Sequence, residues 1–313
     1  MGRRDLVLLT DHSSTEGTRE AMAIAARRLT GRDPVMLDAR HFMTDGAHGA
    51  GPAGRIEALG DGTVRLEAGG TAVTTDAVVV YEIPPHRRPA FARCQRQLRT
   101  SGVRSLGTDV DAWRAATEKG RTVEHFIRDG VPHMPTITLS RPGPQAAAEA
   151  FERLGGDVWA RPCVGMGGND VFHVTDHAQL AAAARHYADL GQDWLIARDA
   201  RNFAADGRRH QYRVVVLGGR AVRAVEHVQP DPDAPCNECQ GASSTTLEID
   251  ELPPGLADLA ILATKSLGLP LAGVDLAAES GGVVFEVNVH PAFGHTRGVD
   301  QIAAPYVAAH LHS

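Results

Sequence analysis

The chain of 313 residues has few cysteines, few aromatic residues and no long apolar run. Its four cysteines do not make a disulfide framework in a chain of this length, so we expect reduced thiols. No apolar run approaches the roughly 20 residues that a membrane helix needs. Leu6–Leu9 is also too short for the core of a signal peptide. These absences predict a cytoplasmic protein with no membrane partner.

An excess of positive charge is also missing. The formal net charge is −6, which gives no electrostatic reason to expect nucleic acid as the main partner. Apolar residues make up 43% and charged residues 22% of the chain, which argues against a mainly disordered protein. The length corresponds to about two or three domains, so a cleft between domains is available for small molecules.

Short apolar runs in the first hundred residues predict a small α/β domain with a parallel sheet. The strands are expected at Leu6–Leu9, Val35–Leu37 and Val78–Tyr81. Between the last two, Arg55–Leu59 and Thr63–Glu67 alternate around a Gly-Asp-Gly turn, which predicts a hairpin.

A helix is expected after the first strand. Ser13 and Glu16 have the spacing of a capping box, and Gly31 provides a stop. One face of this helix is expected to carry Ala21, Ile24, Ala25 and Leu29.

The middle of the chain combines helices with short strands. One helix is predicted over Asp111–Arg128, followed by a strand over Thr136–Leu139. Two further strands, Val158–Pro162 and Val171–Val174, flank a glycine-rich loop at Val164–Asn169. Glycines let backbone N–H groups approach a ligand closely, so this loop is a candidate phosphate flap.

The last third of the chain is rich in strands, which predicts an α+β arrangement there. Two hairpins are expected, each with a Gly-Gly turn; they pair Tyr212–Leu217 with Ala221–Glu226, and Leu271–Ala277 with Val283–Asn288. Helical spacing is found at Leu256–Leu267 and Gln301–Leu311.

Three hard oxygen ligands fall on the second of these hairpins. Glu286 and Asn288 lie two apart on a strand, so both side chains share a face. Asp275 precedes Glu286 across the Gly-Gly turn, which can bring the two acids opposite one another. Carboxylate and amide oxygens are the ligands that magnesium prefers. Spacing alone leaves two readings open, a metal site and a hairpin with scattered surface acids.

Several segments in fixed order carry a resemblance to a known family. They are Lys119–Pro135, Ala160–Pro162 with its glycine loop, Tyr212–Val216, Gly273–Leu276, Phe285–Asn288, and Asn288–Pro291 with Gly298–Asp300. Together they resemble the ATP-grasp superfamily, in particular the RimK-like glutamate ligases and related amino-acid or peptide ligases. The resemblance covers about residues 108–313. It implies the ATP-grasp fold, with an N-terminal domain at 1–107 and two subdomains, 108–197 and 198–313, that enclose a nucleotide.

The resemblance also implies a role for individual residues. ATP would be bound by Lys119, Arg161, Gly165, Gly167, Gly168, Ala197 and Asp199. Two magnesium ions, with Mn²⁺ as an alternative, would be held by Asp275, Glu286 and Asn288. Arg213 would stabilise the transferred phosphate, and the substrate side would include Asn237, Gly241 and His290. Three positions depart from the family pattern: Arg161 replaces a lysine, Arg198 replaces an acid, and Gln211 replaces an aspartate.

The activity implied by the resemblance is ATP-dependent ligation of a carboxylate to an amine. An acyl phosphate would form first, and ADP and phosphate would be released. Two alternatives remain: a phosphotransferase acting on a hydroxyl, and a nucleotide-binding protein without catalysis. The sequence leaves open whether the acceptor is an amino acid, a peptide or a protein, and whether the chain forms a homo-oligomer.

Weaker signals have two interpretations each. Cys236 and Cys239 form a C-x-x-C pair, which suits zinc or redox chemistry, but no second pair is present, so a substrate loop is favoured. Arg87 and Arg88 follow a strand end and could grip an acidic substrate or form a surface turn. Core packing is expected for Trp113, Trp159 and Trp194.

Overall fold

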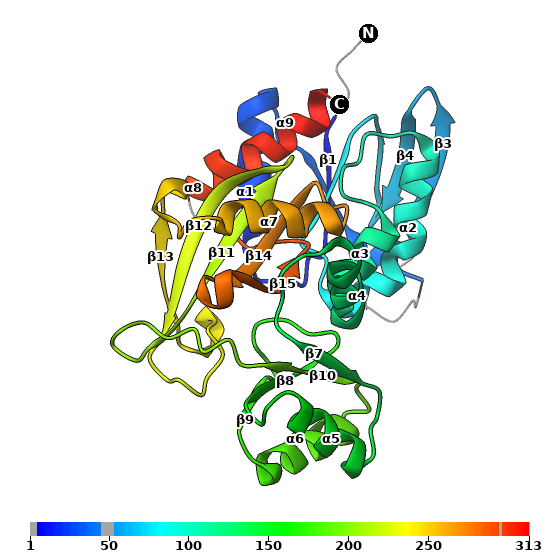
Figure 1. Ribbon diagram of the computed structural model, residues 1–313. Coiled ribbons are helices and arrows are strands. Elements are labelled where there is room, and N and C mark those ends of the chain that lie inside the picture. The colour runs from blue at the N-terminus through cyan, green and yellow to red at the C-terminus, as the bar shows by residue number, and fades with distance from the viewer. Residues whose placement is uncertain (1–4, 45–52, 294–295, 313) are drawn as a thin grey trace. The chain divides into compact units, whose positions relative to one another are not determined.

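The computed structural model describes residues 5–44, 53–293 and 296–312. The chain forms two compact units (Figure 1). Unit 1 comprises Met1–Trp113, Leu269–Leu271 and His290–Ser313, and unit 2 comprises Arg114–Gly268 and Ala272–Val289. The finer division of the chain at residues 107 and 197 stays a prediction.

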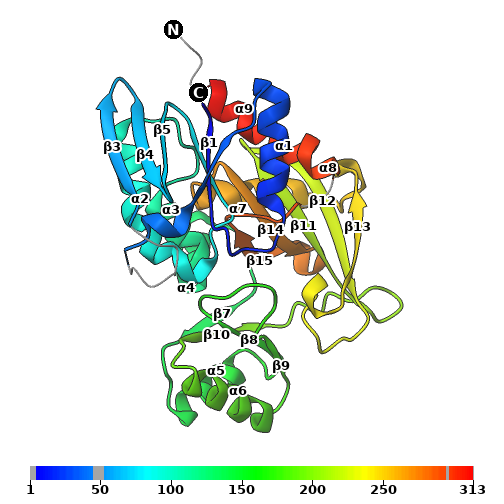
Figure 2. The same cartoon turned by 180° about the vertical axis from the view of Figure 1, so that it is seen from behind.

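Unit 1 contains a three-stranded parallel sheet in the order β2-β1-β6. The strands are β1 (Val7–Thr10), β2 (Val35–Asp38) and β6 (Val78–Tyr81), as the apolar runs predict. All residues of β1 and β6 are buried, which explains why these strands are apolar without alternation. Helix α1 (Thr18–Thr30) packs on β1 and on α9 (Ala304–His312), as Figure 2 shows.

The start of α1 differs from the prediction. The N-cap is Gly17 in a left-handed conformation, and no side chain caps the helix, so the capping box at Ser13 and Glu16 does not form. Ser13 instead donates its hydroxyl to Asp11. The buried face is also rotated: Met22 and Ala26 are buried, whereas the predicted Ile24 and Leu29 are exposed. Gly31 ends the helix as expected.

Unit 1 also contains a small antiparallel sheet and the helix α2 (Arg88–Ser101). Its strands are β3 (Arg55–Gly60), β4 (Thr63–Ala68) and β5 (Thr71–Thr75). The predicted hairpin is therefore confirmed, but the third strand was not predicted.

The predicted helix over Asp111–Arg128 is wrong as a single element. It consists of α3 (Val110–Thr117) and α4 (Lys119–Asp129), with Glu118 in an extended conformation between them. The backbone N–H of Lys119 donates to the carbonyl of Cys163, 2.9 Å away, instead of to a carbonyl in the preceding turn. The interruption between α3 and α4 thus depends on a hydrogen bond to a residue 44 positions later in the chain.

The first part of unit 2 is a four-stranded antiparallel sheet in the order β7-β10-β8-β9. Its strands are β7 (Thr136–Leu139), β8 (Val158–Pro162), β9 (Phe172–Val174) and β10 (Trp194–Arg198). Helices α5 (Pro144–Arg153) and α6 (His177–Asp189) pack on it around Phe151, Tyr187 and Trp194 (Figure 1).

The second part of unit 2 is a five-stranded sheet in the order β13-β12-β11-β14-β15. Its strands are β11 (Arg209–Leu217), β12 (Arg220–Gln229), β13 (Ser243–Leu247), β14 (Leu271–Ala277) and β15 (Val283–Asn288). Both predicted hairpins are confirmed, and β13 is additional. Helix α7 (Leu256–Ser266) packs on β11, β12 and β15.

The C-terminal helix is longer and less regular than predicted. The turn α8 (Thr296–Gly298) is followed by a π-helical stretch, Val299–Ala303, and then by α9. Across the part of the chain that is described, no helix combines the length and apolar character needed to span a membrane.

Candidate functional site

The β14–β15 hairpin places the three predicted metal ligands together. Asp275 on β14 lies directly opposite Glu286 on β15, and Asn288 is opposite Gly273. A register shift follows Asp275, which locally distorts the strand at this point. The alternating neighbours on the other face are buried and apolar: Val274, Leu276 and Val287. The expectation that Asp275 lies opposite Glu286 is therefore confirmed, and the register shift is what pairs the two residues.

Arg213 on β11 forms a two-pronged ion pair with Asp275. Its Nε and Nη2 atoms donate to the two carboxylate oxygens over 2.6 and 2.8 Å. Burial lowers the pKa of Arg213, but the charge and hydrogen bond of Asp275 outweigh this and raise it above its ordinary value. Asn288 donates its side-chain amide to the same carboxylate at 3.2 Å. Asp275 thus joins two of the other predicted site residues.

Lys119 occupies the first position of α4 and reaches the other acid. Its Nζ lies 3.1 Å from Oε1 of Glu286, and the lysine side chain is only 9% exposed. The backbone bond to Cys163 holds the start of the helix beside the end of β8. The two acids of the hairpin are therefore each balanced by one cation, Asp275 by Arg213 and Glu286 by Lys119.

Arg161 on β8 is a third cation at this place. Its Nε is buried without a hydrogen-bond partner among the described residues. Burial lowers the pKa of Arg161, while the charges of Glu286 and Asp275 act in the opposite direction. A guanidinium N–H that is buried without a hydrogen-bonding anion is costly, because this donor loses its water partner. Arg161 therefore has a donor available for an anionic ligand.

A cavity with about 920 Å³ of empty volume, part of it open to solvent, lies between the two sheets of unit 2. Nine of the residues predicted from the sequence line it: Lys119, Arg161, Gly165, Gly168, Ala197, Asp199, Asn237, Asp275 and Glu286. One wall is apolar and includes Met134, Ala197, Ala200 and Phe285.

Five other predicted residues are not part of this lining. Arg213 and Asn288 donate hydrogen bonds to Asp275, which is part of the lining, and Gly167 lies within the glycine loop. Gly241 follows Asn237 in the loop after β12, where it adopts a positive φ of 94°. His290 belongs to unit 1, where its ring packs against Tyr81 and Trp113.

His290 is held by backbone and aromatic contacts. The N–H of Ile83 donates to its Nδ1 at 3.3 Å. Burial lowers the pKa of His290 well below its ordinary value, and the charge of Arg88 acts in the same direction. These contacts describe a packed, neutral ring, and a substrate role for His290 stays a prediction.

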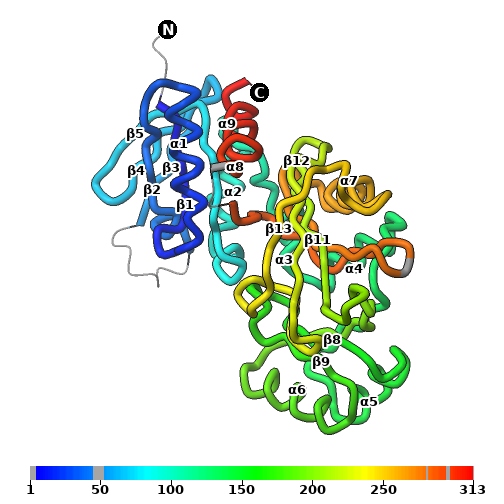
Figure 3. Tube along the Cα trace, turned by 90° about the vertical axis from the view of Figure 1, so that its left-hand side faces the viewer, coloured from blue at the N-terminus to red at the C-terminus, as the bar shows by residue number. Residues whose placement is uncertain are grey.

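The glycine loop contacts the segment after β12. Gly167 and Gly168 have φ angles of 69° and 70°, which side chains rarely adopt. A Cβ on Gly168 would lie 3.0 Å from Gln240 and 3.3 Å from Pro235. Gln240 donates its side-chain amide to the carbonyl of Gly167 at 3.3 Å. Figure 3 shows the same relation, with the yellow segment after β12 beside β8 and β9.

The C-x-x-C pair lies in this same segment. Cys236 is buried, its thiol donates to the carbonyl of His227 at 3.1 Å, and burial raises its pKa to about 12. Cys239 is exposed. Neither cysteine belongs to a metal-binding group in the part of the structure that is described. Asn237 caps the short helix Glu238–Gln240, which contains Cys239, by accepting from the N–H of Cys239.

Asp199, predicted as a nucleotide contact, forms a buried ion pair that the sequence did not reveal. Its two oxygens accept from Arg209 over 2.7 and 2.9 Å, and both side chains are almost fully buried. The guanidinium carbon of Arg209 lies 4.9 Å from the centroid of the Trp159 ring, and Trp159 donates its indole N–H to Asp199. Trp159 lines the cavity, so the expectation of core packing is wrong for it, whereas Trp113 and Trp194 are buried as predicted.

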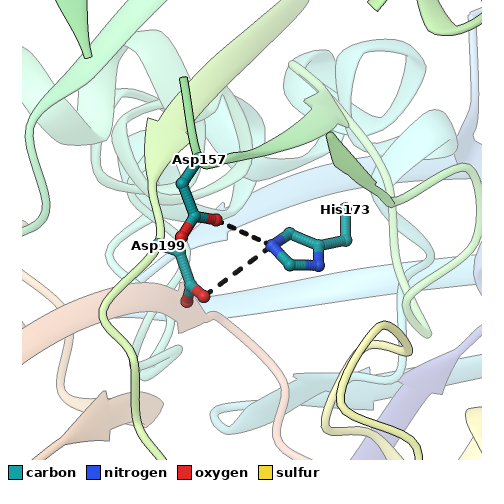
Figure 4. Close-up of side chains that lie close together, drawn as sticks. All are labelled: Asp157, His173 and Asp199. Carbon is teal, nitrogen blue, oxygen red and sulfur yellow. Dashed lines mark hydrogen bonds and ion pairs between the residues drawn. The ribbon is translucent and has the colours of Figure 1, made fainter. Parts of the chain in front are cut away.

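Asp199 also belongs to a cluster with Asp157 and His173 (Figure 4). Nε2 of His173 lies 2.8 Å from Asp157 and 3.8 Å from Asp199, while Nδ1 lies 2.7 Å from Asp233. Such a set of groups has the composition of a metal site. Arg209 already supplies the cation for Asp199, so we interpret the cluster as a tie between β9 and the segment after β12. No sequence motif joins these scattered residues.

Comparisons with known proteins agree with this geometry. The model of the RimK-like ATP-grasp domain matches residues 136–305. The probable alpha-L-glutamate ligase of Legionella pneumophila is 25% identical over 198 residues, which cover 63% of this chain. The match spans 62% of that relative, less than two thirds of its length.

Solved structures show the same fold. The ATP-grasp ligase PsnB, complexed with a minimal precursor, aligns with a TM-score of 0.67 at 15% identity, covering 99% of this chain and 98% of that one. D-alanyl-alanine synthetase A from Vibrio cholerae aligns with a TM-score of 0.69 at 16% identity, covering 100% and 98%. At such identities the likeness shows the ATP-grasp fold alone. Because the family model matches more than half of the chain, the protein belongs to the RimK-like ATP-grasp domain family.

Proposed function

We propose that the protein is an ATP-dependent carboxylate–amine ligase that releases ADP and phosphate. The observation that carries this proposal is the placement of Asp275, Glu286 and Asn288 on one hairpin, beside Arg213 and at the edge of a cavity. Family membership supports ATP as the nucleotide.

The donor set fits magnesium. Two carboxylates and one amide oxygen are hard ligands, and magnesium is usually held by one or two carboxylates together with substrate phosphates. When bound, the ions neutralise the charge that develops as the phosphoryl group is transferred. Mn²⁺, which also accepts oxygen ligands, is an alternative. A solved relative of this fold is complexed with Mg and ADP.

The chain's own residues would hold the nucleotide. Arg161 has a buried Nε without a hydrogen-bond partner among the described residues, and Lys119 lies beside it at the cavity wall, so both suit the phosphates. The glycine loop offers backbone N–H groups, because Gly165 and Gly168 bring the main chain to the cavity without side chains. The apolar wall at Met134 and Phe285 suits the adenine ring.

The chemistry is proposed in two balanced steps. A carboxylate oxygen of the substrate attacks the γ-phosphorus of ATP, and the bond to ADP breaks, which gives an acyl phosphate. An amine then attacks the acyl carbon, phosphate leaves, and the ammonium proton is lost to give an amide. Arg213 would stabilise the negative charge on the transferred group with the N–H donors that its ion pair with Asp275 leaves free, because a guanidinium carries five donors.

The substrate classes follow from relatives. One group of relatives is named as probable alpha-L-glutamate ligases, and the PsnB complex contains a precursor peptide. We therefore propose an amino acid or a peptide as the acceptor, with the reaction in the cytoplasm.

The test is ADP release from Mg-ATP with pools of amino acids and peptides, followed by the mass of the product. We expect ADP and phosphate in equal amounts and a product lighter by one water than the sum of its two substrates. A stable phosphorylated product without an amide would replace the ligase by a phosphotransferase. Binding of Mg-ATP without turnover in any pool would identify a non-catalytic nucleotide-binding protein.

A further inference from the structure

A second cationic group lies on the polar face of the five-stranded sheet, next to Arg213. In the register of β11 and β12, Arg213 is opposite Val225. Arg223 and His227 are two residues before and after Val225 on the same strand, so their side chains share its face. Diagonal neighbours in an antiparallel pair are roughly 7–8 Å apart, within reach of long side chains. Arg213, Arg223 and His227 therefore surround one position on the sheet.

Arg223 has no partner within the described chain. Its side chain makes no hydrogen bond or ion pair with any described residue, and its Nε is buried. Burial lowers the pKa of Arg223, and the charge of Glu238 opposes this effect. Arg213, by contrast, already donates to both oxygens of Asp275. The positive charge of Arg223 is the one that a ligand would meet.

His227 is the second independent observation. The ring is 4% exposed, Nδ1 is 2.8 Å from the hydroxyl of Ser244 on β13, and Nε2 is buried without a partner among the described atoms. Burial lowers the pKa of His227, and the charges of Arg213, Asp275 and Glu238 all act on the ring. The imidazole is therefore part of the same electrostatic environment as the reacting groups. A buried ring nitrogen without a partner is costly unless a ligand or water satisfies it.

We propose that Arg223 and His227 form a subsite that binds a carboxylate group of an amino-acid substrate, beside Arg213. A carboxylate is the anion of choice because the planar guanidinium donates two parallel hydrogen bonds to its oxygens. Glu238, exposed on the segment after β12, is an acid whose charge already acts on Arg213, on Arg223 and on the ring of His227. The substrate carboxylate takes over this balancing role. The inference rests on the proposed function and names the substrate group that the ligase recognises.

The subsite is distinct from the carboxylate that reacts. Arg213 on β11 is next to Asp275 on β14, which is one of the predicted metal ligands, whereas Arg223 lies on β12, on the opposite side of β11. A substrate held there carries a free carboxylate in addition to the group that reacts. An acidic amino acid such as L-glutamate has this form.

The test uses the full chain with Mg²⁺ and a non-hydrolysable ATP analogue. Binding of L-glutamate is compared with binding of its α-amide, isoglutamine, by calorimetric titration. We expect wild-type protein to bind L-glutamate at least tenfold more tightly than isoglutamine. Arg223→Met removes the guanidinium, so the preference should fall below threefold. Arg220→Met is the matched control, because Arg220 is an exposed arginine on the same strand, and it should keep the wild-type preference.

Equal affinity of the wild type for both compounds, or no binding of L-glutamate, would overturn the subsite. A preference that Arg223→Met leaves unchanged would overturn it as well. His227→Gln provides a second variant and should weaken the binding of L-glutamate more than the binding of isoglutamine. Binding of the ATP analogue is measured in the same titrations. If the analogue binds, these binding preferences test the subsite independently of the ADP-release assay. Failure of the subsite proposal can therefore be distinguished from failure of the proposed ligase reaction.

Discussion

The buried ion pair between Asp199 and Arg209 provides a quantitative test of how unit 2 is held together. The two side chains are 2% and 3% exposed, and two charged hydrogen bonds of 2.7 and 2.9 Å join them. Arg209→Met would leave the carboxylate of Asp199 buried with neutral donors only. Removing one partner of a buried pair costs about 3–5 kcal/mol. Trp159 and the N–H of Arg201 still donate to Asp199, so we expect the lower end, about 3 kcal/mol.

The assay is equilibrium urea denaturation, with hydrogen exchange of β10 and β11 to assign the loss to unit 2. Arg208→Met is the matched control, because Arg208 forms an exposed pair with Asp206 and should change the free energy of unfolding by less than about 1 kcal/mol. The double variant Arg209→Met, Asp199→Asn should be less destabilised than the sum of the singles, by about 1–3 kcal/mol. Equal effects of Arg208→Met and Arg209→Met, or additive singles, would refute the reasoning.

The same pair has a pH dependence. Burial raises the pKa of Asp199, but the hydrogen bonds and charge of Arg209 lower it below its ordinary value of 3.8. A carboxylate with a lowered pKa in the folded state stabilises the fold above its ordinary value, and this stabilisation is lost as the pH falls below it. The difference in unfolding free energy between wild type and Arg209→Met should therefore shrink in acid, which the same urea titrations measure.

Three further predictions concern the site and unit 1. Asp275→Asn should lower the rate of ADP release at least about 100-fold, and a rate within threefold of wild type would contradict the metal assignment. Gly168→Ala should raise the KM for ATP about tenfold, because Gly168 has a φ of 70° and the new Cβ would lie 3.0 Å from Gln240. Gly191→Ala is the control, because Gly191 has a similar φ of 64° but open space around it, and it should leave the KM for ATP unchanged. Burial lowers the pKa of His310 to about 4 from an ordinary value of 6.5. The free energy of unfolding should therefore fall by up to about 3 kcal/mol between pH 6.5 and 4. In urea titrations of His310→Gln, this pH dependence should be absent.

The elements with strict patterns could be predicted from the sequence. The alternation in Leu271–Ala277 and Val283–Asn288 indicates which side chains share a face. The pairing of Asp275 with Glu286 depends in addition on the register shift after Asp275, because the regular pairing of Leu276 with Val284 would place Asp275 opposite Phe285. The buried strands of unit 1 follow from their continuous apolar runs. The strand β13 was not predicted, because Ser243–Leu247 is mostly serine and threonine and has no apolar alternation.

Contacts between distant segments could not be predicted from the sequence. The break at Glu118 depends on the carbonyl of Cys163, and the partner of Asp199 is an arginine that follows a loop. The cluster around His173 draws its acids from three separate segments, so spacing gives no signal for it. The order of the family segments could predict residues that line one cavity, whereas Arg223 and His227 stand out only when strand pairing and burial are known.

The most direct measurement of the central claim follows an oxygen atom from substrate to phosphate. The carboxylate substrate is labelled with ¹⁸O, incubated with Mg-ATP, amine and protein, and the released phosphate is analysed by mass spectrometry. An acyl-phosphate ligase must transfer one ¹⁸O atom to each phosphate that leaves, because the bond between acyl carbon and oxygen breaks. We predict one labelled oxygen per phosphate together with formation of the amide. Unlabelled phosphate, or label retained entirely in the carboxylate, would contradict the account.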